Sequence, residues 1–410
     1  MSARSALVAV VVTAVLAFSA TSSTAADQGH TGAQDAMDTA VREDGAPGVL
    51  GEAADGGGVW HGAAGVADRR TKRPRLPHDR FRIGSLTKPF VATVLLQLES
   101  ERRLDLDDPV ARWLPGLVRG NGYDGRRITV RQLLGHTSGI HDFVTDSRFD
   151  RAYFGRGFLR HRYDPQRPAG LVRTALAHRP SFAPGTGFRY SNTNYVLAGM
   201  VIEKVTGRSY ATEIRRRLIR PLGLRDTSLP GTSARMPGPH GRAYSRLPAG
   251  GGVGGGVDMR TGRAGKGVGQ AGGAGRAGDA RLAAGRAAGR AYDVTALDPS
   301  FAGASGEMVS STGDLLRFFR ALLSERLLPP RQSAEMRSTV PAGGGSRYGL
   351  GLTERRLSCG TRIWEHEGDI HGSRSVAAGT PDGTHTAVFN VNADWTRDTD
   401  ELVEAEYCRS

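Results

Sequence analysis

A serine and a lysine three residues apart carry the first chemical signal in this sequence. Only four of its 55 Lys and Arg residues are lysines, and one of them, Lys88, follows Ser85 at i+3. The apolar residues after Lys88 recur at helical spacing, so both side chains are expected on one face of a helix start. A buried ammonium can lose its proton whereas a guanidinium cannot, so the pair predicts a serine nucleophile with a neutral lysine base. A capping serine beside a surface lysine is the alternative, and the scarcity of lysine argues against it.

Two further motifs could complete such a site. Tyr190 and Asn192 are two residues apart in a turn-like segment, where the phenol could relay a proton and the amide could donate and accept. His366 and Gly368 lie on an expected strand, where a polar side chain beside a glycine suits a substrate lying along the strand edge. Each motif alone is weak, because a packed tyrosine or a turn asparagine would give the same letters.

No metal or cofactor is expected. His366, Glu367 and His371 do not have the H-E-x-x-H spacing of a zinc helix, and Gly368 and Gly372 would interrupt any helix. The sequence contains no G-x-S-x-G elbow, which argues against an α/β-hydrolase. The glycine runs near 251–291 lack the flanking strand and helix patterns of a phosphate-binding loop.

Residues 1–26 have the pattern of a secretory signal peptide: a charged start at Arg4, an apolar run, and small residues before Ala26. That run is shorter than the roughly 20 residues of a membrane span, so we expect no stable span and a secreted or cell-wall-associated protein. In an exported protein the two cysteines, Cys359 and Cys408, are most simply one disulfide. Two buried free thiols are the less favoured alternative.

The net charge of +14 comes partly from residues 251–291, which are rich in Gly, Ala and Arg and contain no aromatic residue. Such a composition cannot bury enough apolar surface to fold, so we predict a disordered insertion. The positive charge favours contact with anionic cell-wall polymers, or equally reflects solubility and an Arg-rich composition. Nucleic-acid binding is not expected, because interleaved aromatic residues are lacking and export is predicted.

The elements that must position the motifs indicate an α+β fold. Helices are expected near 33–43, after residue 85, through much of 96–240, and at 399–408, and residues 308–323 look like a strand end leading into a helix. Strands are expected within these ranges: 49–66, 348–355, 361–365, 373–379 and 385–391. The pattern predicts an antiparallel sheet flanked by terminal helices, with an inserted helical lobe.

Together the three motifs resemble those of penicillin-binding serine hydrolases, in the branch of class C β-lactamases and secreted Streptomyces-type D-alanyl-D-alanine carboxypeptidases. Residues 133–140 (LLGHTSGI) are similar to the LLxHTSGL element of that family, and 221–224 to its PLGL turn. The two cysteines resemble the carboxypeptidase disulfide. The resemblance implies one β-lactamase/transpeptidase-like domain over 33–408, with an α/β lobe at 33–95 and 300–408 and a helical lobe at 96–299.

The resemblance also implies a role for each motif residue. Ser85 would attack an acyl carbonyl and form an acyl-enzyme, with Lys88 as its base. Tyr190 would carry the proton to the leaving group, and Asn192 would position Lys88 and the substrate amide. Water would then release the acyl group.

Substrate binding follows from the third motif. The backbone N–H groups of Ser85 and Asp369 would form the oxyanion hole, and Arg355 or Arg356 would be candidates for a substrate carboxylate. Glu367 departs from the family, whose carboxylate-binding members carry Thr or Ser there. If Glu367 faces the cleft it would repel a carboxylate and favour esters or free-amine D-peptides, and the alternation of strand side chains leaves its direction open.

We therefore predict an exported serine hydrolase, with D-alanyl-D-alanine carboxypeptidase activity on peptidoglycan peptides as the leading interpretation. An esterase, a class C-like β-lactamase and a D-aminopeptidase are the enzymatic alternatives. A non-catalytic penicillin-binding module is the alternative of another class, and the intact nucleophile, base and tyrosine argue against it. We expect β-lactams as covalent ligands.

Overall fold

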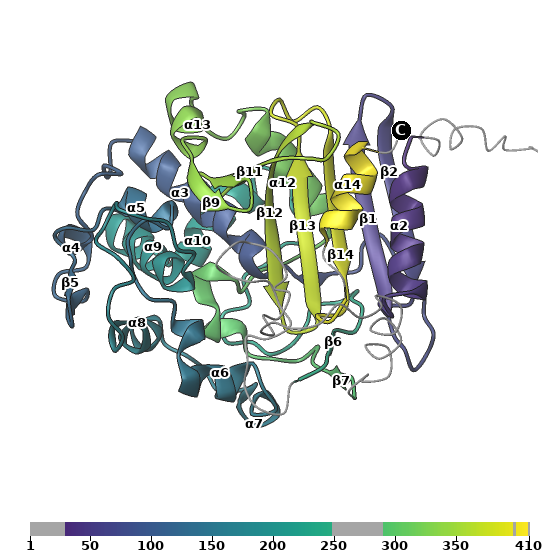
Figure 1. The fold of residues 1–410 in the computed structure, drawn as a ribbon, viewed down its shortest axis with the longest axis horizontal. Helices are drawn as coiled ribbons and strands as arrows, with labels where there is room; N and C mark the ends of the chain where they lie inside the picture. The colour runs from purple at the N-terminus through teal and green to yellow at the C-terminus, as the bar shows by residue number, and fades with distance from the viewer. Residues whose placement is uncertain (1–28, 248–289, 397–398, 409–410) are drawn as a thin grey trace, which may run out of the picture.

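The computed structural model describes residues 29–247, 290–396 and 399–408 (Figure 1). The predicted signal peptide at 1–26 lies outside the described residues. The predicted insertion at 251–291 also lies outside them, except for its last two residues. No helix among the described residues has both the length and the apolar character needed to cross a bilayer.

An eight-stranded antiparallel sheet joins the two ends of the described chain. Its strand order is β2-β1-β14-β13-β12-β11-β10-β9. The strands are β1 (Gly48–Asp55), β2 (Gly58–Gly65), β9 (Val340–Gly343), β10 (Ser346–Tyr348), β11 (Thr353–Arg356), β12 (Arg362–Ile370), β13 (Ser373–Gly379) and β14 (Thr386–Val391). Val49 lies opposite Val391, so the N-terminal hairpin is bound directly to the last strand.

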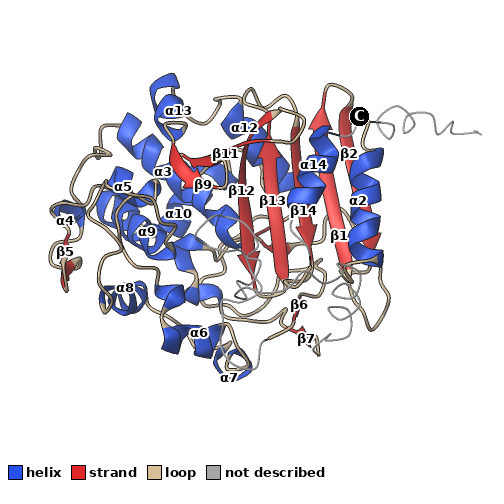
Figure 2. Cartoon of the chain, in the orientation of Figure 1, coloured by secondary structure: helices blue, strands red, loops and turns tan. Residues whose placement is uncertain are grey.

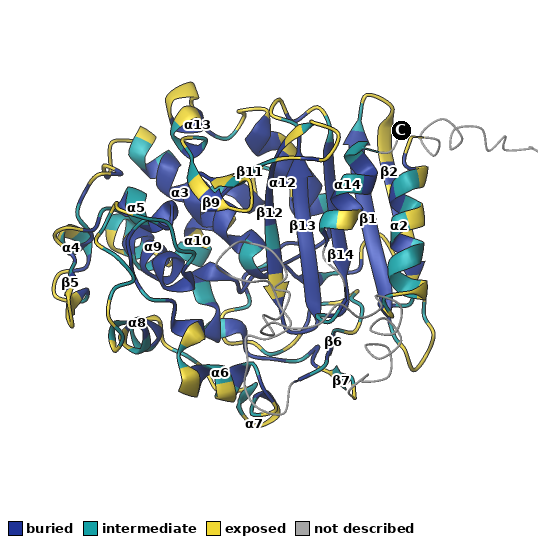
Figure 3. Ribbon diagram, in the orientation of Figure 1, coloured by how far each residue is buried: buried dark blue, intermediate teal, exposed yellow. Residues whose placement is uncertain are grey.

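Helices cover both faces of this sheet. The terminal helices α2 (Thr31–Arg42) and α14 (Asp400–Cys408) pack on one face and α12 (Thr312–Leu323) on the other (Figure 2). Because β13 and β14 are covered on both sides, they are buried along their whole length (Figure 3). Side chains of β13 alternate accordingly, with Ala377 in the core beneath α12 and Val376 in the core beneath the terminal helices.

The helical lobe lies beside β12 and contains most of the segment between β2 and β9 (Figure 1). Its helices are α3 (Thr87–Ser100), α4 (Val110–Trp113), α5 (Val130–Leu134), α6 (Ser147–Tyr153), α7 (Phe158–His161), α8 (Pro168–Leu176), α9 (Asn192–Thr206) and α10 (Tyr210–Ile214). Helix α13 (Pro330–Met336) packs against α3. Short strand pairs join β3 (Phe81–Arg82) to β8 (Val309–Ser310), β4 (Arg119–Gly120) to β5 (Tyr123–Asp124), and β6 (Tyr244–Ser245) to β7 (Tyr292–Asp293).

The predicted α+β fold is confirmed. The expected single strand at 348–355 is wrong in detail, because the chain turns between β10 and β11. Gly351 makes that turn with a φ of +86°, and a Cβ added there would lie 2.8 Å from Ala92. Only glycine adopts such a conformation without strain and leaves room for the helix below.

Candidate active site

The predicted nucleophile lies at the start of the central helix of the lobe. Ser85 is in a short 3-10 turn, η1 (Gly84–Leu86), and α3 begins two residues later. Ser85 is half-buried and reachable, whereas Lys88, one turn further on, is completely buried. A nucleophile at a helix start lies where free N–H groups and the helix dipole stabilise developing negative charge.

Lys88 has the surroundings of a neutral amine. Its Nζ lies 2.8 Å from Ser85 Oγ, 2.8 Å from Asn192 Oδ1 and 2.9 Å from the carbonyl oxygen of Ser305. Burial lowers the pKa of Lys88 to about 7, against a smaller opposing effect of Asp142. A neutral amine has two N–H bonds and one lone pair. The amide and carbonyl oxygens can only accept, so they take both N–H bonds and the lone pair is left for the hydroxyl of Ser85.

Tyr190 is the second group that touches the nucleophile. Its phenol hydrogen-bonds the Ser85 side chain, and its ring lies 4.8 Å from Lys88 Nζ. Tyr190 is half-buried, and the enclosure of its phenol raises the pKa well above the ordinary value. The phenol therefore keeps its proton at neutral pH and can donate to Ser85 or to a leaving group, which fits a proton relay.

Asp142 is a member of the site that sequence reasoning missed. Its carboxylate accepts a 3.0 Å hydrogen bond from Asn192 Nδ2, which fixes the amide so that Oδ1 faces Lys88. Asp142 is buried, and burial raises its pKa to about 6. It reaches the site because Thr193, next to Asn192 on α9, accepts a hydrogen bond from Phe143 N and donates one to His141 O. The sequence signal was an acidic residue two positions after the LLGHTSGI element.

The third motif brings β12 against the nucleophile's turn. A Cβ added to Gly368 would overlap the carbonyl oxygen of Ile83, and one added to Gly84 would lie 2.6 Å from the carbonyl oxygen of Asp369. Gly84 also has a φ of +50°. Both glycines are therefore required for the strand and the turn to touch, and this contact places the Asp369 backbone beside Ser85.

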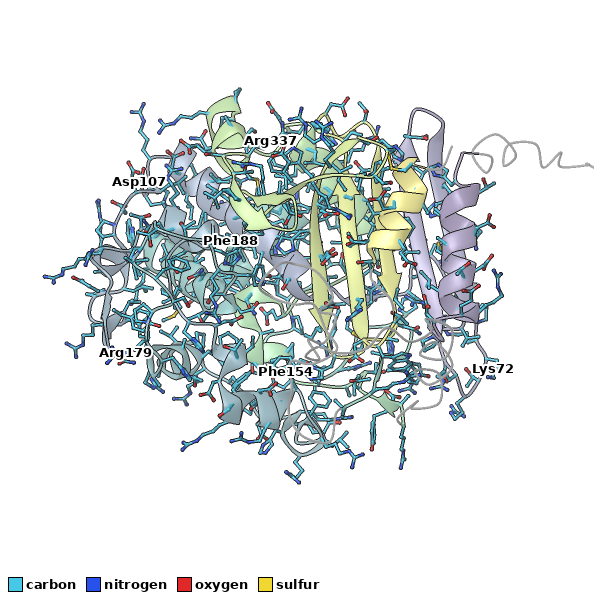
Figure 4. All side chains as sticks on the ribbon, in the orientation of Figure 1. Lys72, Asp107, Phe154, Arg179, Phe188 and Arg337 are labelled. Carbon is cyan, nitrogen blue, oxygen red and sulfur yellow. A yellow bond between two sulfur atoms is a disulfide. The ribbon has the colours of Figure 1, made fainter. Side chains whose placement is uncertain are left out.

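His366 holds a tyrosine in place and is not cationic. Burial and the charge of Lys88 lower the pKa of His366 to about 3. Its Nδ1 lies 2.6 Å from the carbonyl oxygen of Glu367, which can only accept, so Nδ1 carries the proton. Nε2 then accepts a 3.0 Å hydrogen bond from Tyr348. Phe188, from the turn before Tyr190, is labelled in Figure 4. Its ring is tilted by 43° to that of Tyr348, with ring centroids 5.7 Å apart.

His136 of the LLGHTSGI element was singled out only as part of a motif, and the structure places it beneath Tyr190. Its ring centroid is 4.3 Å from that of Tyr190, and Nδ1 accepts from Ser191 N at 3.2 Å. Burial keeps the pKa of His136 well below its ordinary value, so the ring is neutral. It packs against Tyr190 without adding charge to the site.

The residues expected to bind a substrate carboxylate are not presented together. Arg355 is already paired with Glu365 at 2.7 Å and with Asp400 at 2.7 Å. Arg356 is exposed at the end of β11. Glu367 is half-buried and lies on the strand face shared with Glu365, opposite to His366.

Cys359 and Cys408 form a disulfide, with Cα atoms 5.5 Å apart. The bond joins the turn before β12 to the last described residue of α14. The predicted pairing is confirmed. Among the described residues, no group of three or more His, Cys, Asp or Glu side chains is arranged to hold a metal ion.

A serine, a buried neutral lysine and a protonated tyrosine on an α+β scaffold of this topology are typical of a serine hydrolase. Residues 33–406 match the sequence family described as Beta-lactamase, and the chain belongs to that family. The predicted relationship to penicillin-binding serine hydrolases is confirmed.

Known proteins similar to the chain fall within the same fold. The D-stereospecific amidohydrolase from Streptomyces sp. is 47% identical, with a TM-score of 0.80 over 93% of this chain and 99% of that one. The D-amino acid amidase from Ochrobactrum anthropi SV3 is 28% identical, with a TM-score of 0.71 over 92% and 97% of the two chains. Penicillin-binding protein 4 of Amycolatopsis lactamdurans is 32% identical over 196 residues, which are 48% of each protein. The chain spans about half or less of the curated relatives it matches.

Proposed function

We propose that this protein is a D-stereospecific amidohydrolase, which cleaves amide or peptide bonds of D-amino acids that carry a free ammonium group. The observation that carries this proposal is the near-complete match, at 47% identity, to the Streptomyces amidohydrolase. The similarity to a D-amino acid amidase supports the same substrate class.

The proposed reaction follows from the hydrogen bonds of the site. Lys88 takes the proton of the Ser85 hydroxyl, and Oγ forms a bond to the substrate carbonyl carbon. The negative charge on the carbonyl oxygen is met by the backbone N–H groups of Ser85 and Asp369. Tyr190 gives its proton to the leaving amine and recovers one from Lys88. A water molecule, deprotonated by the same base, then hydrolyses the ester to Ser85.

The charges near the third motif favour an ammonium over a carboxylate in the substrate. Arg355 is surrounded by the carboxylates of Glu365, Glu367 and Asp400, three negative charges around one positive charge. Glu367 also acts electrostatically on Tyr190, whose pKa it helps to raise. Glu367 therefore places a negative charge within electrostatic reach of the site, and such a charge attracts a cation and opposes a terminal carboxylate.

The test compares kcat/KM for D-phenylalanine amide, L-phenylalanine amide, N-acetyl-D-phenylalanine amide and an acylated D-Ala-D-Ala peptide. We expect the free-amine D-amide to be the best of the four, with Ser85→Ala inactive on all. Equal rates on the D- and L-amides would refute stereospecificity. Preference for the acetylated amide would refute recognition of the ammonium. Glu367→Gln should reduce the ratio of kcat/KM for D-phenylalanine amide to that for N-acetyl-D-phenylalanine amide.

D-alanyl-D-alanine carboxypeptidase activity is the second candidate, and the similarity to a penicillin-binding protein favours it. We propose β-lactams as covalent ligands of Ser85 in either case. Intact-mass measurement after incubation with a β-lactam separates the classes. A lasting adduct together with release of D-Ala from the peptide would indicate a carboxypeptidase. Rapid loss of the adduct would indicate a β-lactamase. A lasting adduct without turnover of any amide, peptide or ester would indicate a penicillin-binding module.

We also propose that the protein acts outside the cytoplasm, where it would meet peptidoglycan fragments and anionic wall polymers. The signal-like residues 1–26 and the disulfide between Cys359 and Cys408 support this location. Mass spectrometry of protein from the culture medium should show a chain that begins near residue 27. Recovery only from the cytoplasm with the first residues retained would refute it.

A further inference from the structure

A small cavity rich in arginine lies away from Ser85, where segments far apart in the sequence meet. Its volume is about 20 Å³. Four of the residues that line it are arginines and, in the part of the chain that the structure describes, none is acidic. The lining residues that carry the argument are Arg75, Arg80, Arg82, Arg242, Asn390 and Asn392.

Arg75 is buried at this cavity, and the hydrogen bonds and ion pairs of its guanidinium group are incomplete. Its Nη2 donates to Asn390 Oδ1 at 2.7 Å and Nη1 to the carbonyl oxygen of Gly48 at 3.4 Å, but Nε has no hydrogen-bond partner. The carboxylate of Asp79 lies 3.8 Å from Nε, too far for a hydrogen bond, and it is shared with Arg73 at 2.9 Å. One negative charge therefore serves two guanidinium groups.

The positive charge of Arg82 is compensated even less than that of Arg75. It is buried, Nη2 donates to the carbonyl oxygen of Leu297 at 2.9 Å, and both Nε and Nη1 lack a partner. Among the described residues it forms no ion pair. The nearest carboxylates that act on it, Asp298 and Glu307, are engaged elsewhere: the first caps a turn at Ser300, and the second accepts from Tyr210.

Arg80 and Arg242, at the outer side of the cavity, do not change this balance. Arg80 is paired with Asp226 at 2.7 Å, and Arg242 with Asp293 at 3.2 Å. Burial lowers the pKa of the two inner arginines to about 10, so both remain charged at neutral pH. The cavity thus has two cations at its wall, three buried N–H groups without acceptors, and no carboxylate among its described lining residues.

Water alone could satisfy the N–H groups but would leave the charge uncompensated, and a buried unpaired charge is strongly unfavourable. A volume of about 20 Å³ holds one or two species of the size of water. We propose that this cavity binds a small inorganic anion of halide size, between the guanidinium groups of Arg75 and Arg82. Asn392 Oδ1, an acceptor without a partner on the same wall, suits a water molecule that accompanies the ion.

The ion would fasten the base of the nucleophile's turn to the sheet. Arg82 is three residues before Ser85, and its carbonyl oxygen accepts a 2.7 Å hydrogen bond from Ser373 on β13. The site is independent of the proposed substrate, so its test does not depend on the activity assays.

The test is thermal unfolding of the full chain in sodium gluconate, with sodium chloride substituted stepwise at constant ionic strength. We expect a saturable rise in unfolding temperature, because a ligand that binds only the folded state at 100 times its Kd shifts the folding equilibrium by about 100-fold. Arg82→Met should abolish the chloride dependence. Arg217→Met should retain it, because Arg217 lies outside the cavity and is paired with Glu101 and Glu213.

Anomalous diffraction from a bromide-soaked crystal of the unsubstituted protein decides the case even if Arg82→Met does not fold. We expect a peak between Arg75 and Arg82. Identical unfolding temperatures in chloride and gluconate would overturn the proposal, and a bromide peak without that solution effect would mean binding at crystal concentration only. A chloride effect that survives in a folded Arg82→Met variant, or a peak at another place, would overturn it as well.

Discussion

Asp142→Asn should move the pH dependence of catalysis toward acid. Asp142 is joined to the base through two hydrogen bonds, 3.0 Å to Asn192 Nδ2 and 2.8 Å from Asn192 Oδ1 to Lys88 Nζ. Above its own pKa of about 6 the carboxylate is ionised and stabilises the ammonium form of Lys88. Its removal therefore favours the neutral amine, which is the form that accepts a proton from Ser85.

The size of the shift follows from this geometry. Two hydrogen bonds and one amide place the carboxylate at most roughly 8 Å from Nζ, where Coulomb's law at an effective dielectric constant of about 20 gives about 2 kcal/mol. That energy corresponds to about 1.5 pKa units. Starting from a pKa of about 7, Lys88 in the variant should titrate near about pH 5.5.

The assay is kcat/KM for the substrate turned over best, measured from pH 4.5 to about pH 9 in a constant-ionic-strength buffer, because this ratio reports the ionisation of the free enzyme. We expect the acid limb of the profile to move down by about one to two units. Asp107→Asn, which removes a surface carboxylate paired with Arg131, is the matched control and should leave the limb in place. If Asp142→Asn lowered only the plateau of kcat/KM and left the acid limb of the pH profile in place, Asp142 would act on packing and not on the charge of Lys88.

Three further predictions concern the base, the third motif and the disulfide. Lys88→Arg should block acylation despite the retained charge, because a guanidinium cannot act as the base; wild-type rates of β-lactam adduct formation would contradict this. Gly368→Ala should lower kcat by about 100-fold or more, because the added Cβ would displace β12 from the turn of Ser85 and disrupt the oxyanion hole. Gly56→Ala is the control and should leave kcat nearly unchanged, because an added Cβ there meets no atom within 4 Å. Cys359→Ser should reduce the free energy of unfolding by about 2–4 kcal/mol, since the bond to Cys408 closes a loop of 49 residues; an unchanged urea midpoint would argue against a stabilising bridge.

The residues of the site that could be predicted are those whose chemistry is local. Ser85 and Lys88 are three residues apart at the start of α3, and Tyr190 and Asn192 are two residues apart at the start of α9, so short motifs were enough to find them. The long strands of the sheet and the terminal helices were also accessible, because their apolar patterns are strong, whereas β9 and the turn between β10 and β11 were not.

The parts that could not be predicted depend on contacts across the fold. Asp142 meets Asn192 from 50 residues away. Ser305 contributes only a backbone carbonyl oxygen, which no side-chain pattern can signal. The engagement of Arg355 by Asp400 arises from packing of the last helix on the sheet, so the sequence alone could present Arg355 as available for substrate.

The position of β1 between β2 and β14 has a consequence for how the enzyme is made. The hairpin of β1 and β2 is translated long before β14, its inner neighbour in the sheet. Asp369, which faces the turn of Ser85, also arrives some 280 positions after it. Such distant pairings cost loop entropy and form late. Until β12 has been translated, a nascent chain therefore contains Ser85 without the Asp369 backbone that lies against its turn in the folded protein.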